Sequence, residues 1–267
     1  MADLQVLVAT LHQDDFSLAE KMNIRCDAVI ANQADRESDE HRETEFGVLR
    51  MITTKTRGVG KNRNIALDAA ESEIILFADD DVTYNDDMPE NVVKAFCENE
   101  KADVIIFGMD ITKGGKVTAK KHLEKKKLRV WNSLRFGTYV VAARRKAVEE
   151  KGIRFCEYFG GGCIYSAGED SLFIKNCFDK GLSVYSHDYV LGTCAKDSST
   201  WFTGYGEKYF YDRGALVRFL FPKTMYLMGL YFAVRFKRET DVSVVKRIKL
   251  VYEGIVKSKK LMPYGNK

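Results

Sequence analysis

Short apolar runs alternate with segments of helical pattern through the first 110 residues of the chain. The apolar runs are found near residues 4–10, 28–31, 48–52, 74–79 and 104–108. Helices are expected between them, near residues 16–22, 58–70 and 91–99. Strands that alternate with helices are typical of βαβ units. The sequence therefore predicts an α/β fold, with a mostly parallel central sheet flanked by helices.

The second half of the chain has a less regular pattern. The strongly basic segment 116–130 is expected to form a helix, and residues 138–142 a strand. A further helix is expected from residue 171 to 180, because its apolar residues recur with helical spacing. The glycines 160–162 precede this helix, and they either let the backbone approach a ligand closely or form an ordinary loop.

The apolar run near residues 74–79 ends in three consecutive aspartates, Asp79, Asp80 and Asp81. Adjacent carboxylates repel one another, so a folded protein tolerates them in solvent or beside a cation. Open α/β sheets bind their ligands at the carboxyl ends of the strands, which is where these residues are expected. A hard cation such as Mg2+ or Mn2+, itself carrying a diphosphate, fits this cluster. A solvated acidic turn is the alternative that the triplet leaves open.

Charge and cysteine content narrow the class of protein. The net charge of +4 and the pI near 8.6 are too weakly basic to predict nucleic-acid binding. Lys and Arg crowd residues 113–129 and 235–260, whereas Asp and Glu dominate residues 79–100, which suits a protein that meets an anionic surface on one side. The six cysteines show no CxxC pair, so we expect no zinc site and a reducing, cytoplasmic environment.

The sequence contains no apolar run of the roughly 18 residues that a membrane-spanning helix needs. Because residues 4–10 already have a strand pattern, no signal peptide is expected either. The apolar segment 224–234 is followed by Arg235 and further basic residues. This mixture suits a segment that lies on the inner face of the cell membrane, or a helical cap that covers the sheet.

Four motifs, in this order and spacing, resemble those of the family 2 glycosyltransferases, which have a GT-A fold. The start, 8–12, is similar to the family's first strand and turn, although Ala9 replaces the usual proline. Residues 58–67 resemble the Arg-Asn start of the helix before the metal motif, and 79–81 occupy the place of the D-x-D motif. Residues 168–170 match the Glu-Asp motif. The resemblance covers about the first 185 residues and is nearest to bacterial capsule and cell-wall polysaccharide transferases.

The resemblance implies inverting transfer of a sugar from a nucleotide-diphospho-sugar, most often a UDP-sugar, to an acceptor hydroxyl. Asp79 and Asp81 would then hold Mn2+ or Mg2+ on the diphosphate, while Asp80 stays outside the ligand set. Asp170 would be the general base and Glu169 would orient the site. A pair of acidic residues that simply favours the first turn of a helix is the alternative for these two. The Q-x-x-R-W motif of polymerising members is absent, which favours transfer of a single sugar.

The resemblance also implies a donor site. Its predicted members are Thr10, Asn32, Gln33, Asp35, Arg63, Asp79 and Asp80. The family usually carries an aspartate after its second strand that reads the uracil ring, and here Asn32 and Gln33 stand in that place with Asp35 two residues later. An amide can still pair with a uracil edge, since it both donates and accepts hydrogen bonds.

Four further residues are weaker candidates. His187 lies where some GT-A enzymes place a metal-binding histidine, although a lone histidine at a strand end is more often structural. Gly161 and Gly162 are assigned to acceptor binding, together with Trp201 in a segment that would close over the donor. Packing of Trp201 against the core is the alternative.

On this interpretation residues 1–215 form the GT-A catalytic domain, with a nucleotide-sugar-binding half at 1–110 and an acceptor-binding half at 111–215. Residues 216–267 form a basic, amphipathic helical extension that suits a lipid-linked glycan acceptor. A nucleotidyltransferase is a competing class, but its phosphate loop needs glycine and a basic residue, which 11–15 lack. The acidic triplet disfavours a nucleic-acid-binding module, so no nucleic acid is expected as a partner. A non-catalytic partner of a transferase is the remaining alternative, and the intact Asp79, Asp81 and Asp170 count against it.

Overall fold

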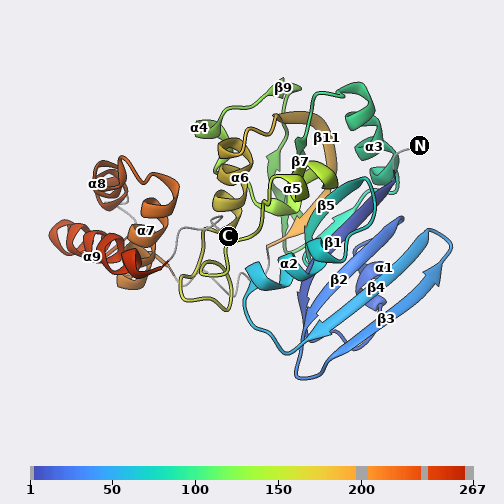
Figure 1. The fold of residues 1–267 in the computed structure, drawn as a ribbon, viewed down its shortest axis with the longest axis horizontal. Coiled ribbons are helices and arrows are strands. Elements are labelled where there is room, and N and C mark those ends of the chain that lie inside the picture. Colours follow the sequence, from blue (N-terminus) through green and yellow to red (C-terminus); the bar gives the residue numbers. More distant parts are fainter. Residues whose placement is uncertain (1–2, 197–203, 236–239, 262–267) are drawn as a thin grey trace.

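The computed structural model describes residues 3–196, 204–235 and 240–261. A large mixed sheet forms the centre of the molecule (Figure 1). Within the described residues its strand order is β3-β4-β2-β1-β5-β10-β7-β11-β6, with β8 paired to β7 and β9 to β11. The expected α/β fold, a central sheet flanked by helices, is therefore confirmed.

The first half of the chain supplies the parallel part of the sheet. Its strands are β1 (Leu4–Leu11), β2 (Asp27–Gln33), β4 (Gly47–Thr54) and β5 (Ile74–Asp79), with β3 (Ser38–Thr44) antiparallel at the edge. The intervening helices are α1 (Ser17–Lys21), α2 (Val59–Asp68) and α3 (Met88–Glu98). These strands and helices lie where the apolar pattern predicts them, apart from β3, for which no strand is expected.

The chain from residue 82 onward, apart from α3, supplies the mixed part. Its strands are β6 (Val82–Tyr84), β7 (Val104–Lys113), β8 (Lys116–Lys121), β9 (Lys126–Lys127), β10 (Val141–Arg144) and β11 (Val184–Ala195). Its helices before residue 196 are α4 (Val130–Ser133), η1 (Thr138–Val140), α5 (Arg145–Glu150) and α6 (Glu169–Asp179). β10 runs antiparallel to both β5 and β7, whereas β11 runs parallel to β7.

Two expectations for this half need correction. The basic segment 116–130 is not a helix, because its first residues form the exposed strand β8, which pairs with β7 through a turn at Gly114 and Gly115. Both glycines have positive φ, 57° and 72°, as the tight turn of a two-residue hairpin requires. The strand expected at 138–142 begins as the 3-10 turn η1 and becomes extended only at Val141.

The main core covers both faces of the parallel strands. The side chains of Val6, Val8 and Ile30 are fully buried, as expected for strands covered by helices on both sides. Phe77 on β5 contacts the rings of Phe155 and Phe173 at 5.1 Å each, and these two rings stack at 4.3 Å. This aromatic group holds α6 against the sheet, close to the end of β5.

The C-terminal helices pack against α6 and the loop that precedes it. They are α7 (Glu207–Leu220), α8 (Met225–Arg235) and α9 (Val244–Lys257), followed by η2 (Ser258–Lys260). Figure 1 shows them grouped at one end of the molecule, on the side of α6. α7 runs across residue 215, so the predicted division at that residue falls inside a helix. In the described parts of the chain, no helix has the length and apolar character that crossing a membrane would need.

Candidate active site

The site is built around Arg63, a buried cation on α2. Its side chain forms ion pairs with three carboxylates, at 2.6 Å to Asp79, 2.9 Å to Asp170 and 3.3 Å to Glu169. Only 3% of Arg63 is exposed to solvent. The pairs connect the end of β5 with the start of α6, two segments that are about 90 residues apart in the sequence.

The neighbours of Arg63 on α2 fix its position. Asn62 donates hydrogen bonds to the carbonyl oxygens of Thr10 and Ala31, which ties α2 to the ends of β1 and β2. Asn64 donates to the carbonyl oxygen of Phe155 and accepts a hydrogen bond from its backbone N–H. The guanidinium of Arg63 lies 5.3 Å from the ring of Phe155. The two asparagines of the Asn-Arg-Asn sequence therefore anchor α2 to the neighbouring backbone, and the arginine between them extends into the site.

The parallel register brings the ends of three strands to one edge of the sheet. Ala9 on β1 is paired with Asp79 on β5, and Thr10 on β1 with Asn32 on β2. The hydroxyl of Thr10 donates to Asp80 Oδ2 at 2.6 Å. Thr10, Arg63 and the aspartates thus meet at the carboxyl ends of the strands, which is the position expected for ligand binding in an open α/β sheet.

Glu169 and Asp170 occupy the first turn of α6 but have different surroundings. Burial raises the pKa of Glu169 to about 7, and the neighbouring charge of Asp170 adds to this effect while Arg63 opposes it. Its Oε2 accepts a hydrogen bond from the N–H of Gly168 at 3.0 Å. Asp170 is more exposed, and its Oδ1 accepts both the Arg63 contact and the Thr138 hydroxyl at 2.6 Å.

Electrostatic pairing keeps Arg63 charged. Burial alone would lower the pKa of its guanidinium, but Asp79, Asp170 and Glu169 together raise it above the ordinary value. A buried charge is tolerated only when it is paired and hydrogen-bonded, and three carboxylates satisfy this condition. The arginine is therefore a permanent positive charge between the acidic end of β5 and the start of α6.

The residues fit a divalent cation that arrives together with a phosphate ligand. No three Asp, Glu, His or Cys side chains in the described ranges converge as a finished metal site. Desolvation of the Asp81 carboxylate by surrounding atoms raises its pKa to about 6, and the charges of Asp79 and Asp80 add to the effect. Carboxylate oxygens suit Mg2+ and Mn2+, and Mg2+ is commonly held by one or two carboxylates together with phosphate and water.

His187 lies outside this cluster. It is on β11, half-buried, 5.6 Å from the ring of Phe107 and 3.9 Å from a Glu98 carboxylate oxygen. The residue of β11 that approaches Asp81 is Cys194, seven residues further on, or about 20 Å along an extended strand. The structure therefore does not bring His187 to the aspartates, and burial lowers the pKa of its ring where it lies.

The amides at the end of β2 are already engaged in the fold. Asn32 accepts a hydrogen bond from the N–H of Gln13 and donates to the carbonyl oxygen of Gln13 and the hydroxyl of Thr53. Gln33 donates to the carbonyl oxygen of Gly58, at the start of α2. Both are buried, whereas Asp35 is exposed and pairs with Arg57. Of the three residues predicted to read the base, Asp35 is the one whose side chain faces solvent.

The glycine-rich loop is bonded to the start of α2 rather than standing free. The carbonyl oxygen of Gly161 accepts the N–H of Val59 at 2.9 Å. Gly160 has a φ of 101°, and a Cβ there would lie 2.3 Å from Val59 Cγ1. Gly162, with a φ of 74°, lies directly over Gly58. The loop thus has a packing role, and its assignment to acceptor binding stays a prediction. Trp201 lies outside the described residues.

Thr138 is a member of the site that sequence reasoning missed. Its side chain is fully buried in η1 and donates to Asp170 Oδ1. The residue stands in a segment expected to be a strand, where a threonine is common. Its distance of 32 positions from Asp170 left no local signal, so only the tertiary structure could assign it.

A sheet of this order, with carboxylates at the end of β5 and the start of α6, defines a GT-A glycosyltransferase. The family model for glycosyl transferase family 2 matches residues 18–153, just over half of the chain, and the protein belongs to that family. The matched range includes Arg63 and the three aspartates, while Glu169 and Asp170 lie beyond it. No curated protein matches the sequence closely.

Solved structures of one protein share the fold. S. aureus TarS 1–349 in complex with UDP-GlcNAc has 17% identity and a TM-score of 0.59, over 97% of this chain and 73% of that one. The complex of TarS 1–349 with UDP has the same identity and TM-score, over 95% and 70%. A structure of S. aureus TarS has 15% identity and a TM-score of 0.55, over 95% of this chain but 43% of that one.

Proposed function

We propose that this glycosyltransferase moves one sugar from a nucleotide-diphospho-sugar, preferably a UDP-sugar, to an acceptor hydroxyl with inversion at the anomeric carbon. The observation that carries the proposal is the position of Arg63, which joins the donor-side Asp79 to Asp170 on α6. The binding of UDP and UDP-GlcNAc by TarS, which shares the fold, supports a uridine donor.

Asp79 and Asp81 are the residues that would hold a divalent cation on the donor diphosphate. Such a cation supplies positive charge where the leaving diphosphate gains negative charge. Arg63 and Thr10 each contact one of the neighbouring aspartates. Arg63 pairs with the Asp79 carboxylate and orients it, and the Thr10 hydroxyl restrains Asp80. Asp81 pairs with no arginine among the described residues, so it is the carboxylate with the most to gain from a cation.

Asp170 is assigned as the general base. Arg63 and Thr138 both contact its Oδ1, and we assign Oδ2 to the acceptor hydroxyl. A carboxylate is a weak base for an alcohol, so it accepts the proton as the hydroxyl attacks in the transition state. Glu169, more buried than Asp170 and bonded to the N–H of Gly168, orients the first turn of α6.

The acceptor is proposed to be a lipid-linked glycan in the synthesis of a surface polysaccharide, met at the cytoplasmic side of the membrane. The loop 159–168 leads into α6, and the helix α7 borders this loop. A Cβ at Gly168 would lie 2.5 Å from Leu216 on α7. The C-terminal helices therefore form one wall of the region next to Asp170, where an acceptor has to approach.

The test is thermal unfolding of the protein with nucleotides and nucleotide sugars, each in Mn2+, in Mg2+ and in EDTA. A ligand at 100 times its dissociation constant stabilises the folded state by about 2.7 kcal/mol. We expect a shift confined to UDP and UDP-sugars and lost in EDTA, whereas Asp81→Asn should reduce it and the exposed Asp68→Asn should not. A shift that persists in EDTA would contradict the metal, and no shift with any nucleotide would favour a non-catalytic partner of a transferase.

A further inference from the structure

The outer faces of α8 and α9 carry a stripe of exposed apolar side chains. On α8 the exposed members recur with helical spacing, and they are Tyr226, Leu227, Leu230, Tyr231 and Val234. On α9 the corresponding stripe contains Val245, Tyr252 and Val256. Leu227 is 69% exposed and Val245 79%, so these large side chains contribute little buried area to the described structure. We call this surface the α8–α9 face.

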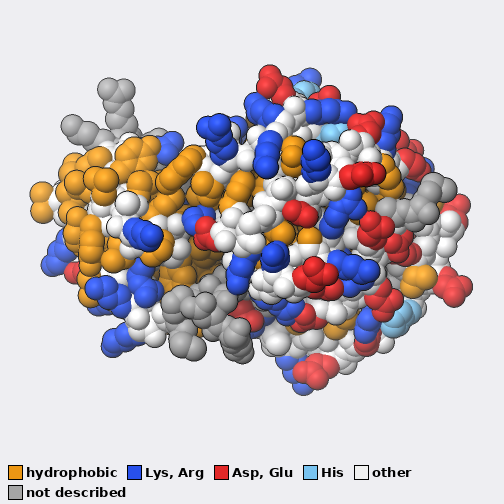
Figure 2. Space-filling view, turned by 45° about the horizontal axis from the view of Figure 1, so that its top comes forward, with side chains coloured by type: hydrophobic (Ala, Val, Ile, Leu, Met, Phe, Trp, Pro, Cys, Tyr) orange, Lys and Arg blue, Asp and Glu red, His pale blue; other side chains and the backbone are white. Residues whose placement is uncertain are grey.

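The two stripes form one continuous surface. The rings of Tyr226 and Tyr252 lie 5.5 Å apart, and the hydroxyl of Tyr252 donates to the carbonyl oxygen of Tyr226. Beneath them, a Cβ at Gly229 would lie 3.0 Å from side chains of Val251 and Ile255, so the helices are closely packed. Figure 2 shows hydrophobic side chains gathered over this end of the molecule, with Lys and Arg around them.

The charge around the α8–α9 face has one dominant sign. In the described residues from 225 to 261, the exposed basic side chains are Arg235, Lys246, Lys249, Lys257, Lys259 and Lys260, against the acidic Asp241 and Glu253, while Arg247 is buried. Lys249 lies within the apolar stripe of α9, and Lys259 and Lys260 lie beyond its end. Apolar anchors with a cationic rim complement an anionic lipid surface, whereas a second copy of the same basic face would be repelled.

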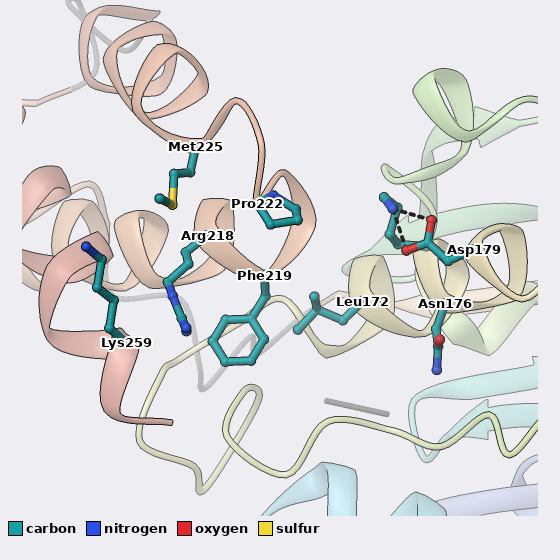
Figure 3. A pocket seen from close by; sticks show the side chains of 9 residues that line it. Leu172, Asn176, Asp179, Arg218, Phe219, Pro222, Met225 and Lys259 are labelled. Carbon is teal, nitrogen blue, oxygen red and sulfur yellow. Dashed lines mark hydrogen bonds and ion pairs between the residues drawn. The ribbon is translucent and has the colours of Figure 1, made fainter. Parts of the chain in front are cut away.

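A cavity of about 510 Å3 opens at the base of α8 (Figure 3). Its apolar wall consists of Leu172, Phe219, Pro222 and Met225. Three cationic side chains also line it, namely Lys175, Arg218 and Lys259. Lys175 pairs with Asp179, and Arg218 donates to the carbonyl oxygen of Ser258. The combination of an apolar wall and excess positive charge suits the phosphate end of an anionic lipid next to its acyl chain.

We propose that the α8–α9 face docks on an anionic phospholipid bilayer, with the cavity between α6 and α7 taking a lipid headgroup phosphate. The docking does not depend on donor chemistry. α7 joins the docked helices to the loop beside Asp170, so docking would present the site to a lipid-linked acceptor. Only this last step rests on the proposed function.

The experiment is co-sedimentation of the full chain with phosphatidylcholine vesicles and with mixed phosphatidylcholine and phosphatidylglycerol vesicles. The protein is expected to bind the mixed vesicles and not the neutral ones. The double variant Leu227→Glu and Leu230→Glu should weaken binding by about tenfold or more, because it removes two apolar anchors and adds two charges that the lipid repels. Phe46→Glu, an exposed aromatic on the β3–β4 turn, is the matched control and should bind like the parent protein.

Further variants make the result decisive. Val245→Glu changes α9 at its most exposed apolar position and should reduce binding like the α8 variant. Lys259→Glu should lower the preference for anionic vesicles severalfold through the cavity. Absence of vesicle binding, equal binding to neutral vesicles, or full binding by the double variant would overturn the proposal. A dimer in light scattering that the double variant dissociates, without vesicle binding, would assign the α8–α9 face to a second copy of the chain. None of these assays needs a donor, so the proposed transfer reaction is tested separately.

Discussion

The buried guanidinium of Arg63 sets the roles of the residues around it, because it contacts three carboxylates that differ in their surroundings. Asp79 lies at the ligand edge of the sheet, Asp170 is partly exposed at the start of α6, and Glu169 is enclosed. The two carboxylates of α6 differ in burial, and burial raises the pKa of Glu169 to about 7. At the residue scale, adjacent residues in one helical turn therefore acquire different chemistry from their environment alone.

Asp170→Asn should reduce the turnover number by about 100-fold or more, because an amide cannot accept the proton from the acceptor. The affinity for the nucleotide should change little, since Asp79 and Asp81 remain. The measurements are kcat for sugar transfer and the dissociation constant of the nucleotide. Asp179→Asn, at the exposed end of the same helix, is the control. Near-normal turnover would remove Asp170 from the role of base.

Thr138→Val replaces the hydroxyl that donates to Asp170 Oδ1 by a methyl group of similar size. We expect kcat to fall by about 10- to 100-fold, as the loss of one hydrogen bond to a charged group is worth roughly 1.5–3 kcal/mol. The KM for the donor should stay nearly unchanged, and Thr138→Ser should restore most of the activity. An equal effect of both substitutions would instead indicate that the threonine methyl group packs the site.

The raised pKa of Glu169 predicts a dependence of stability on pH. The folded protein holds this proton up to about pH 7, whereas the unfolded chain releases it near 4.5. The stability that this group contributes is thus complete below pH 4.5 and is lost as the pH rises to about 7. Glu169→Gln should flatten the fall of the melting temperature across this range, although Asp81 contributes in the same direction. An unchanged slope in the variant would show that Glu169 titrates normally.

At the scale of elements, α7 and α9 cross at backbone contact. A Cβ at Gly214 would lie 2.0 Å from the carbonyl oxygen of Val251, and one at Gly254 would lie 2.0 Å from that of Tyr211. Two glycines on facing helices allow this approach, which no larger residue would permit. The crossing in turn holds the α8–α9 face in place.

Gly214→Ala tests this crossing. Alanine gains about 1 kcal/mol of helix propensity over glycine, but its Cβ would meet backbone that cannot move aside. We expect a net loss of several degrees in the melting temperature, measured by circular dichroism. Gly229→Ala on α8 is the matched comparison, since its Cβ would contact only side chains, at 3.0 Å, and should be nearly neutral. A rise in the melting temperature of Gly214→Ala would contradict the close crossing.

At the scale of the whole molecule, α7 connects the other C-terminal helices to α6 and to the loop that leads into it. One face of α7 packs on Phe159, Tyr165 and Leu172, while Phe210 packs with Val251 and Ile255 of α9. Ser166 in the loop beside the site donates both its N–H and its hydroxyl to Asp212. The first helix of the C-terminal extension, α7, is therefore packed against the loop that borders the site.

Removal of residues 222–267 should lower the melting temperature by at least about 5 °C, because it exposes the buried side of α7. Activity should fall as well, although the carboxylates and Arg63 remain, since α7 borders the loop 159–168. Calorimetry and the transfer assay would measure both effects. A truncated chain that melts and reacts like the full one would establish that the catalytic domain ends before α8.

The sequence by itself determined the alternating strands and helices of the first half and the position of the aspartates at the end of β5. Each of these depends on local information, the apolar period and the order of short motifs. It did not determine the hairpin of β8, because lysine-rich residues suit an exposed helix and an exposed strand equally well; the two glycines of its turn were the available signal.

Only the tertiary structure decided which polar residues share the site. It brought Thr138 to Asp170, engaged Asn32 and Gln33 in the fold, and placed His187 far along β11 from the aspartates. Sequence motifs record residue type and order, whereas a hydrogen bond between residues 32 positions apart depends on how the sheet is assembled. The buried pairing of Arg63 with carboxylates from two distant segments is the clearest case, since its energy exists only once the protein is folded.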